Sequence, residues 1–188
     1  MVRNEKTDQR QGVRRAGRAG AGLILVALAL GLAGEPGFAA DDPILAQMAG
    51  NWVGRGTFKS SPSAEPELVY CKITNTLSNG GTTLNQKGRC AVATNSGRIS
   101  GTIRAQGSGA YDGSLESLST KGPLTFSGKA SNNQIALNAS FVDRKTNKPG
   151  KASIQTVVGN GKYRTVSKTT DTKTRTEFVA SDITFTKQ

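Results

Sequence analysis

Residues 134–143 read QIALNASFVD, and Ile135, Leu137, Ala139 and Phe141 stand at every second position of this stretch. Successive side chains of a β-strand point to opposite faces, so residues two apart share a face. The alternation therefore predicts a strand with one face in a core and the other face in water. Much of the chain after residue 51 follows the same period.

Turn residues interrupt this pattern roughly every ten residues, as they do in all-β proteins. Asn79-Gly80-Gly81 and Gly159-Asn160-Gly161 supply the residue types that tight hairpin turns need. The predicted strands, about nine or ten in number, cover residues 51–58, 67–77, 82–93, 98–105, 110–118, 123–130, 134–143, 151–158, 162–169 and 174–185. A further turn is predicted at residues 95–97.

Tight turns join antiparallel neighbours, so the order of the strands in the sheet should follow their order in the sequence. A flat sheet of this size would have two long exposed edges, and closure removes them. We therefore expect an all-β fold, an antiparallel up-and-down (meander) barrel of about 8–10 strands. The alternative is a two-sheet sandwich. A short helical turn is expected over residues 43–49, where Pro43 suits the start of a helix.

Cys71 and Cys90 are the only two cysteines of the chain. They lie at nearly equal distances from the predicted turn at Gly80, so they should be near neighbours across two paired strands. We expect them to form a disulfide in an oxidising compartment. A reactive or metal-binding pair is the alternative, and the absence of histidine makes it the weaker one.

The first forty residues have the order of a secretory signal. A basic stretch is followed by the apolar run 23–32 and then by small residues that suit cleavage after Ala39. We expect residues 1–39 to be a signal peptide and residues 40–188 to be a single β-barrel domain, periplasmic or secreted. The alternative, an uncleaved anchor, is disfavoured because a bilayer span needs about 20 apolar residues. No transmembrane segment is expected in the mature form.

The chain is strongly basic, with 25 Lys and Arg against 13 Asp and Glu and a formal net charge of +12. Such a surface favours anionic partners, so an anionic envelope surface or a protein partner is one interpretation. The other is that the scattered charges only keep the protein in solution. Nucleic acid is not expected as a partner, because aromatic residues that could stack on bases are few.

The sequence contains no histidine, which excludes a Ser-His-Asp or Cys-His nucleophile. It also removes the usual ligand of catalytic zinc. The remaining acid–base candidates are two carboxylate pairs, Asp112 with Glu116 and Glu177 with Asp182. Asp112 and Glu116 are expected on a solvated edge. We therefore expect no enzyme activity, no cofactor and no metal.

Gly50-Asn51-Trp52 follows the predicted helical turn and begins the first strand. This arrangement resembles the opening Gly-x-Trp of the calycin group, which comprises lipocalins, avidins and their bacterial relatives. The resemblance implies a small exported barrel in which Trp52 closes one end and packs against an arginine of the last strand, matched here to Arg175. The chain also resembles, more loosely, the small periplasmic inhibitors of secreted metalloproteases.

A small barrel either fills with side chains or holds a small ligand. The aromatic residues expected to line such a ligand site are Trp52, Tyr111, Phe126, Phe141 and Tyr163. Small residues between them leave room, so the expected function is non-catalytic binding of a small, partly apolar ligand. The alternatives are a solid core and an interaction protein that acts through its surface and its N-terminal arm, residues 41–49.

Overall fold

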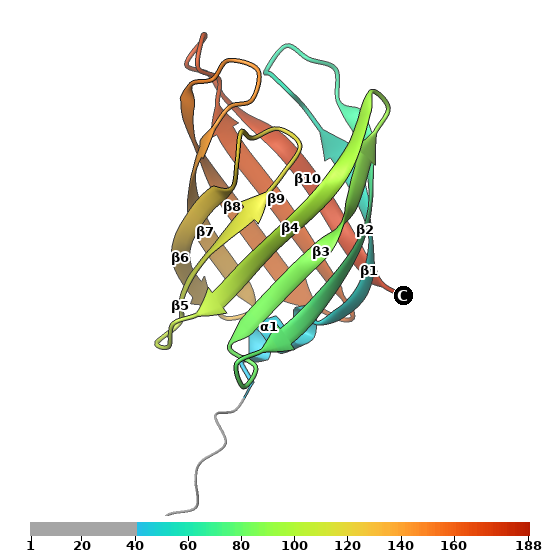
Figure 1. Cartoon of the computed structure of the whole chain (residues 1–188), viewed down its shortest axis with the longest axis vertical. Helices are drawn as coiled ribbons and strands as arrows, with labels where there is room; N and C mark the ends of the chain where they lie inside the picture. The colour runs from blue at the N-terminus through green and yellow to red at the C-terminus, as the bar shows by residue number, and fades with distance from the viewer. Residues whose placement is uncertain (1–40) are drawn as a thin grey trace, which may run out of the picture. The chain divides into compact units, whose positions relative to one another are not determined.

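One short helix and ten strands follow one another along residues 41–188, the residues that the computed structural model describes (Figure 1). The helix α1 spans Pro43–Met48. The strands are β1 (Gly50–Phe58), β2 (Glu67–Ser78), β3 (Thr83–Val92), β4 (Asn95–Ala105), β5 (Ala110–Glu116), β6 (Leu124–Ser131), β7 (Gln134–Val142), β8 (Pro149–Gly159), β9 (Lys162–Thr170) and β10 (Glu177–Lys187). The signal peptide predicted for residues 1–39 lies outside the described residues.

Each strand pairs antiparallel with the strands before and after it, and β1 also pairs with β10. The sheet is therefore a closed up-and-down barrel, and closure removes the exposed edges that a flat sheet of ten strands would have. The all-β meander barrel expected from the sequence is confirmed. The sandwich alternative is wrong.

The turn between β8 and β9 shows how local sequence sets the register. Asn160 and Gly161 have φ angles of 53° and 68°. Both angles lie in the left-handed region that a two-residue hairpin turn requires, and asparagine and glycine reach it most readily. Gly159 consequently pairs with Lys162 across the turn, and the pairing of the two strands continues from there.

One predicted turn is wrong. Residues 95–97 belong to β4, where Ser96 pairs with Ala91 of β3. The chain reverses at residues 93–94 instead. Residues 93–94 suffice for the hairpin turn, so the Asn-Ser-Gly stretch that suggested a turn can belong to the strand.

The last strand begins at Glu177, three residues later than predicted. The reason is the carboxylate of Asp171, which accepts hydrogen bonds from the backbone N–H groups of Lys173 and Thr174 at 2.9 and 2.7 Å. Such bonds hold the backbone in a turn and compete with a strand. Arg175, with a φ of 60°, lies in this turn.

The helix α1 closes one end of the barrel (Figure 1). The Asp42 carboxylate caps it by accepting hydrogen bonds from the N–H groups of Ile44 and Leu45 at 3.1 and 2.9 Å. Ile44, Leu45 and Met48 are all buried. A six-residue helix has little stability alone, so its burial in the barrel maintains it. Within residues 41–188, no helix is both long and apolar enough to cross a bilayer.

Cys71 and Cys90 lie directly opposite each other on β2 and β3, with their Cα atoms 4.1 Å apart. They form a disulfide with an S–S distance of 2.02 Å, which confirms the predicted pairing. Cys71 is fully buried and its side chain belongs to the core. The disulfide therefore links β2 and β3 on the inner face of the barrel.

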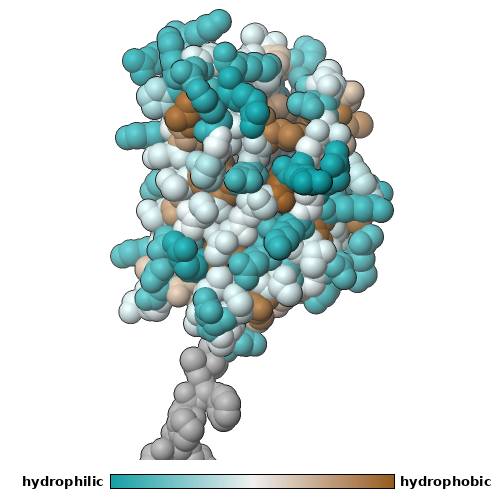
Figure 2. All heavy atoms as spheres, in the orientation of Figure 1, coloured by the Kyte–Doolittle hydropathy of each residue, from teal (hydrophilic) through white to brown (hydrophobic). Residues whose placement is uncertain are grey.

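The outer face is mostly polar. In Figure 2 hydrophilic side chains cover most of the visible surface, and hydrophobic atoms show only in small separate areas. The core lies inside the barrel, where Trp52, Leu84 and Ile135 are among the most deeply buried side chains. Alternation along each strand thus separates an apolar interior from a solvated wall.

Candidate ligand-binding cup

Apolar side chains line the interior of the barrel, and the helix α1 closes one end of it (Figure 1). Inward-facing Leu84 and Ile135, near α1, are almost completely buried. Phe141, Ile154 and Ile183 also face inward. They lie farther from α1 and are only partly buried. Burial does not follow depth alone, because Leu77 near α1 is also only partly buried and Leu124 at the far end is buried. We call the inner surface of the barrel above Trp52 the cup.

Trp52 forms the floor of this cup. Its indole is 1% exposed and packs edge-on against Tyr163, with ring centroids 4.8 Å apart. Tyr163 in turn stacks on Phe185 at 4.5 Å. The indole Nε1 donates a hydrogen bond of 2.8 Å to the backbone oxygen of Met48, so the floor is joined to α1. Edge and stacked contacts of this kind add to the stability given by burial alone.

Polar groups at the floor are bonded to one another. Asn75 donates to the Met48 carbonyl at 2.8 Å and to the Tyr163 hydroxyl at 3.4 Å, and its own oxygen accepts from Gln86 at 3.2 Å. On the other side, the Tyr111 hydroxyl donates to Asp42 at 2.7 Å. No buried side-chain polar atom among the described residues lacks a partner. These hydrogen bonds satisfy the polar groups around the floor and fix their positions.

The large inward side chains above the floor lie against the glycines of neighbouring strands. A Cβ atom placed on Gly113 would meet the ring of Phe126 at 2.6 Å, and one on Gly150 would meet the ring of Phe141 at 2.6 Å. The aromatic rings therefore lie along the wall, in space that only glycine leaves free. This arrangement lets bulky residues line the interior without extending across it.

The inner wall has two chemically different sides. Thr165, Ser167 and Thr169 of β9 face inward, and Ser167 shares a hydrogen bond of 2.7 Å with Ser181 of β10. In a ring of ten strands β9 lies across from β4, whose inward residues include Ile103. A hydroxyl-rich side therefore faces an apolar side.

Charged residues at inward-facing positions of the described strands are confined to the two ends. Glu67 lies in register with Phe58 at the open rim, and its carboxylate accepts a hydrogen bond from Thr94. Lys187 lies in register with Trp52 at the closed end. Between these two ends, the inward-facing positions of the described strands carry no charged residue.

The five aromatic residues predicted to bind a ligand all point into the barrel, at different depths. Trp52, Tyr111 and Tyr163 belong to the floor and are at most 4% exposed. Phe126, at 8%, lies higher on the wall, and Phe141 is the most accessible of the five. Sequence analysis missed other apolar residues of the interior farther from α1, among them Leu115, Ile154 and Ile183, which follow the same two-residue alternation.

The predicted packing of Arg175 on Trp52 is wrong. Arg175 is exposed in the turn before β10, whereas Trp52 pairs with Lys187 near the end of that strand. The two lie at opposite ends of the barrel, because β10 runs antiparallel to β1. Lys187 takes the expected position, with its Nζ 5.7 Å from the centroid of the indole ring.

The four carboxylates considered for acid–base chemistry each have a cross-strand partner of their own. Asp112 forms an ion pair with Arg104 at 2.6 Å, and Glu116 accepts a hydrogen bond from Ser100 at 3.1 Å. Hydrogen bonds from Arg164 hold the pKa of Asp182 below its usual value. These carboxylates take part in cross-strand contacts on the outer wall.

Two buried phenols predict that the protein loses stability in alkali. Burial raises the pKa of Tyr163, and burial together with the hydrogen bond to Asp42 raises that of Tyr111, both above the ordinary 10.0. Above pH 10 the phenols ionise in the unfolded chain but not in the folded protein, so unfolding becomes progressively easier. Urea midpoints measured between pH 9 and pH 11.5 should fall with pH. Tyr163→Phe should make the decline shallower, and an unchanged midpoint in the parent protein would contradict the assignment.

In comparisons with known proteins, no family model and no curated protein matches the chain.

Proposed function

We propose that this protein is an exported, calycin-like and non-catalytic binding protein that holds a small, neutral, partly apolar ligand inside its barrel. The observation that carries the proposal is the composition of the inner wall. It has apolar side chains on one side, the hydroxyls of β9 on the other, and charged residues only at the two ends of the described strands. A cup with an apolar wall and a few polar groups is typical of small-molecule sites.

The chemistry of the wall supports the choice of ligand. Apolar side chains of β4 to β7 would contact a hydrocarbon or ring system, and the hydroxyls of Thr165 and Ser167 would orient a polar substituent. Gly50-Asn51-Trp52 begins β1 at the closed end, as in calycins. The disulfide supports an oxidising compartment such as the periplasm or the exterior.

The alternative, an interaction protein such as a protease inhibitor or envelope-associated factor, depended partly on an available N-terminal arm. The apolar side chains of that arm, Ile44, Leu45 and Met48, are buried in the barrel end. They would have to leave the core to meet a partner. The outer surface of the strands therefore remains as the place where a partner could bind.

A titration with N-phenyl-1-naphthylamine, a neutral apolar fluorophore, tests the proposed function. The probe should gain fluorescence on binding, because the interior excludes water from the dye. Phe141→Gln should weaken its binding about tenfold, since a polar amide would replace an aromatic contact. Leu115→Gln, on a different strand, should have a similar effect.

The matched control is Val142→Gln, which places the same amide one residue away on the outer face, where Val142 is 37% exposed. This variant should bind the probe like the parent protein. Equal losses for Val142→Gln and Phe141→Gln, or no binding by the parent protein, would rule out the interior as the site.

A further inference from the structure

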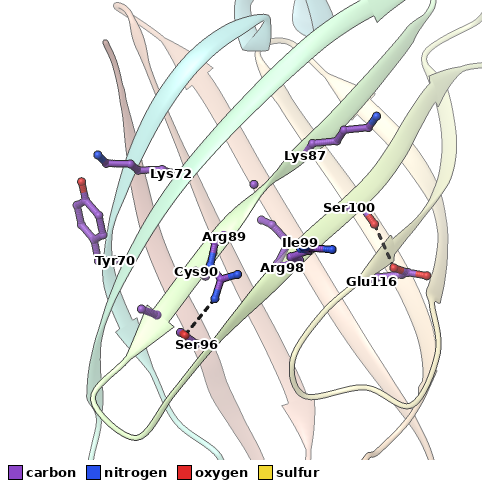
Figure 3. A pocket seen from close by; sticks show the side chains of 12 residues that line it. Tyr70, Lys72, Lys87, Arg89, Cys90, Ser96, Arg98, Ile99, Ser100 and Glu116 are labelled. Carbon is purple, nitrogen blue, oxygen red and sulfur yellow. Dashed lines mark hydrogen bonds between the residues drawn. The ribbon is translucent and has the colours of Figure 1, made fainter.

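Three cations form a straight row across the outer wall of the barrel. Lys72 of β2 is directly opposite Arg89 of β3, and Arg89 is directly opposite Arg98 of β4. All three side chains are exposed. Neighbouring strands are about 5 Å apart, so the row presents positive charges at short, regular intervals. Figure 3 shows the three side chains on neighbouring strands.

These charges have no acidic partner among the described residues. The ion pairs within residues 41–188 join Arg104 to Asp112, Arg164 to Asp182 and Lys168 to Glu177, and none of them involves the row. Like charges directly opposite each other on paired strands destabilise a sheet. The free protein therefore bears an electrostatic cost that an anion bound along the row would remove.

The row crosses a groove of about 690 Å³ on the outer wall. Lys87 adds a fourth cation to the groove, and Tyr70, 39% exposed, borders it. Arg55 lies over the Tyr70 ring, 5.4 Å from its centroid. The groove is thus shallow and has a largely apolar base, with the cations standing along it.

The groove also contains groups that suit hydroxyls. Ser96 and Ser100 line it, and Ser100 donates to the Glu116 carboxylate at 3.1 Å. An exposed carboxylate would repel a partner composed only of anionic groups. It would accept a hydrogen bond from a partner that carries hydroxyl groups between its acidic ones.

We propose that this groove over β2, β3 and β4 binds an acidic polysaccharide. Acidic groups of the sugar chain pair with Lys72, Arg89 and Arg98, and sugar hydroxyls bond to Ser96, Ser100 and Glu116. The site lies on the outside of the wall, so it is separate from the ligand in the interior.

The groove suits a sugar chain better than the other polyanions. Sites for single-stranded nucleic acid combine a basic groove with several aromatic side chains that stack on bases, and the only aromatic residue lining this groove is Tyr70. A lipid bilayer presents a broad surface of headgroups, whereas the cations here form a single row across three strands. The mixture of cations, hydroxyls and one carboxylate matches a chain that is both acidic and hydroxylated.

Binding of dextran sulfate, with neutral dextran as the uncharged probe, tests this site. The parent protein should bind dextran sulfate but not dextran. The variant Lys72→Gln/Arg89→Gln/Arg98→Gln should bind dextran sulfate about tenfold more weakly. The salt dependence of its binding constant should correspond to the release of about two to three fewer counterions. Its melting temperature should rise by about 2 °C or more, because the row of like charges is gone. Arg89→Gln alone should weaken binding by about threefold.

The matched control is Lys129→Gln/Lys145→Gln/Lys162→Gln, which removes the same charge from exposed positions outside the groove. It should bind dextran sulfate within about twofold of the parent protein. Equal weakening in both triple variants would show that net charge alone is responsible and would overturn the proposal. Tighter, row-dependent binding to phosphatidylglycerol vesicles or to single-stranded DNA would overturn it as well.

Discussion

Replacing Trp52 with alanine should lower the free energy of unfolding by about 3–5 kcal/mol, the range for large buried aromatic residues. The indole is 1% exposed, stacks edge-on with Tyr163 and bonds to the Met48 carbonyl. Its removal leaves a cavity where the helix meets the barrel, and α1 loses the contact that seats it. Since domains of this kind are stable by about 5–15 kcal/mol, urea unfolding followed by circular dichroism should show a large shift.

Trp52→Phe provides the comparison for this prediction. Phenylalanine keeps a ring in the floor but cannot donate to Met48, whose carbonyl still accepts a hydrogen bond of 2.8 Å from Asn75. No buried acceptor is left without a donor, so the loss should be about 1–2 kcal/mol. If Trp52→Ala and Trp52→Phe each lower the free energy of unfolding by less than about 1 kcal/mol, Trp52 does not support the floor as described.

Removing the disulfide should cost about 3 kcal/mol, and this is the second large effect that we expect. Cys71 and Cys90 are 19 residues apart, and a cross-link of that span restricts the unfolded chain far more than the folded one. The double variant Cys71→Ala/Cys90→Ala should therefore unfold at lower urea concentration. Because β2 and β3 keep their register through backbone bonds, the variant should still fold into the barrel.

Reduction of the parent protein is the control for the double variant. Treatment with dithiothreitol breaks the bond without changing the packing volume at Cys71, so the two losses should agree within about 1 kcal/mol. If reduction leaves the urea midpoint unchanged while the double variant is destabilised, the effect comes from packing and not from the cross-link. That result would contradict the prediction.

Most of the fold could be predicted from the sequence, because the meander is encoded locally. The alternation in residues 134–143 appears in the structure as β7, Gln134–Val142. The pairing of Cys71 with Cys90 followed from counting outward from one turn, and the two residues lie in direct register. Hairpins with short turns give such predictions because each strand pairs with the next one in the sequence.

The partner of Trp52 could not be predicted, because it depends on the number of strands. In a closed meander with an even number of strands, the first and last strands run antiparallel, so the end of the last strand meets the start of the first. With an odd number the start of the last strand would lie there, and Arg175 would be the neighbour. Ten strands bring Lys187 to Trp52 instead.

The row of cations was missed for a different reason. Lys72, Arg89 and Arg98 are isolated from one another in the sequence and were interpreted as dispersed charge. Register across three strands brings them side by side. Counting outward from the turn between β2 and β3, which paired the two cysteines, also places Lys72 opposite Arg89. The row could therefore be predicted in the same way once the turns were known.

The proposed ligand site in the interior is tested most directly by methyl NMR of isoleucine-labelled protein during a titration with N-phenyl-1-naphthylamine. Ile154 and Ile183 point into the interior farther from α1, whereas Ile44 and Ile135 lie beside α1 and are almost completely buried. We predict that the chemical shifts of the Ile154 and Ile183 methyl groups change progressively as dye is added. Those of Ile44 and Ile135 should stay the same. If no inward isoleucine responds while the dye binds, the interior is solid and the proposed function is wrong.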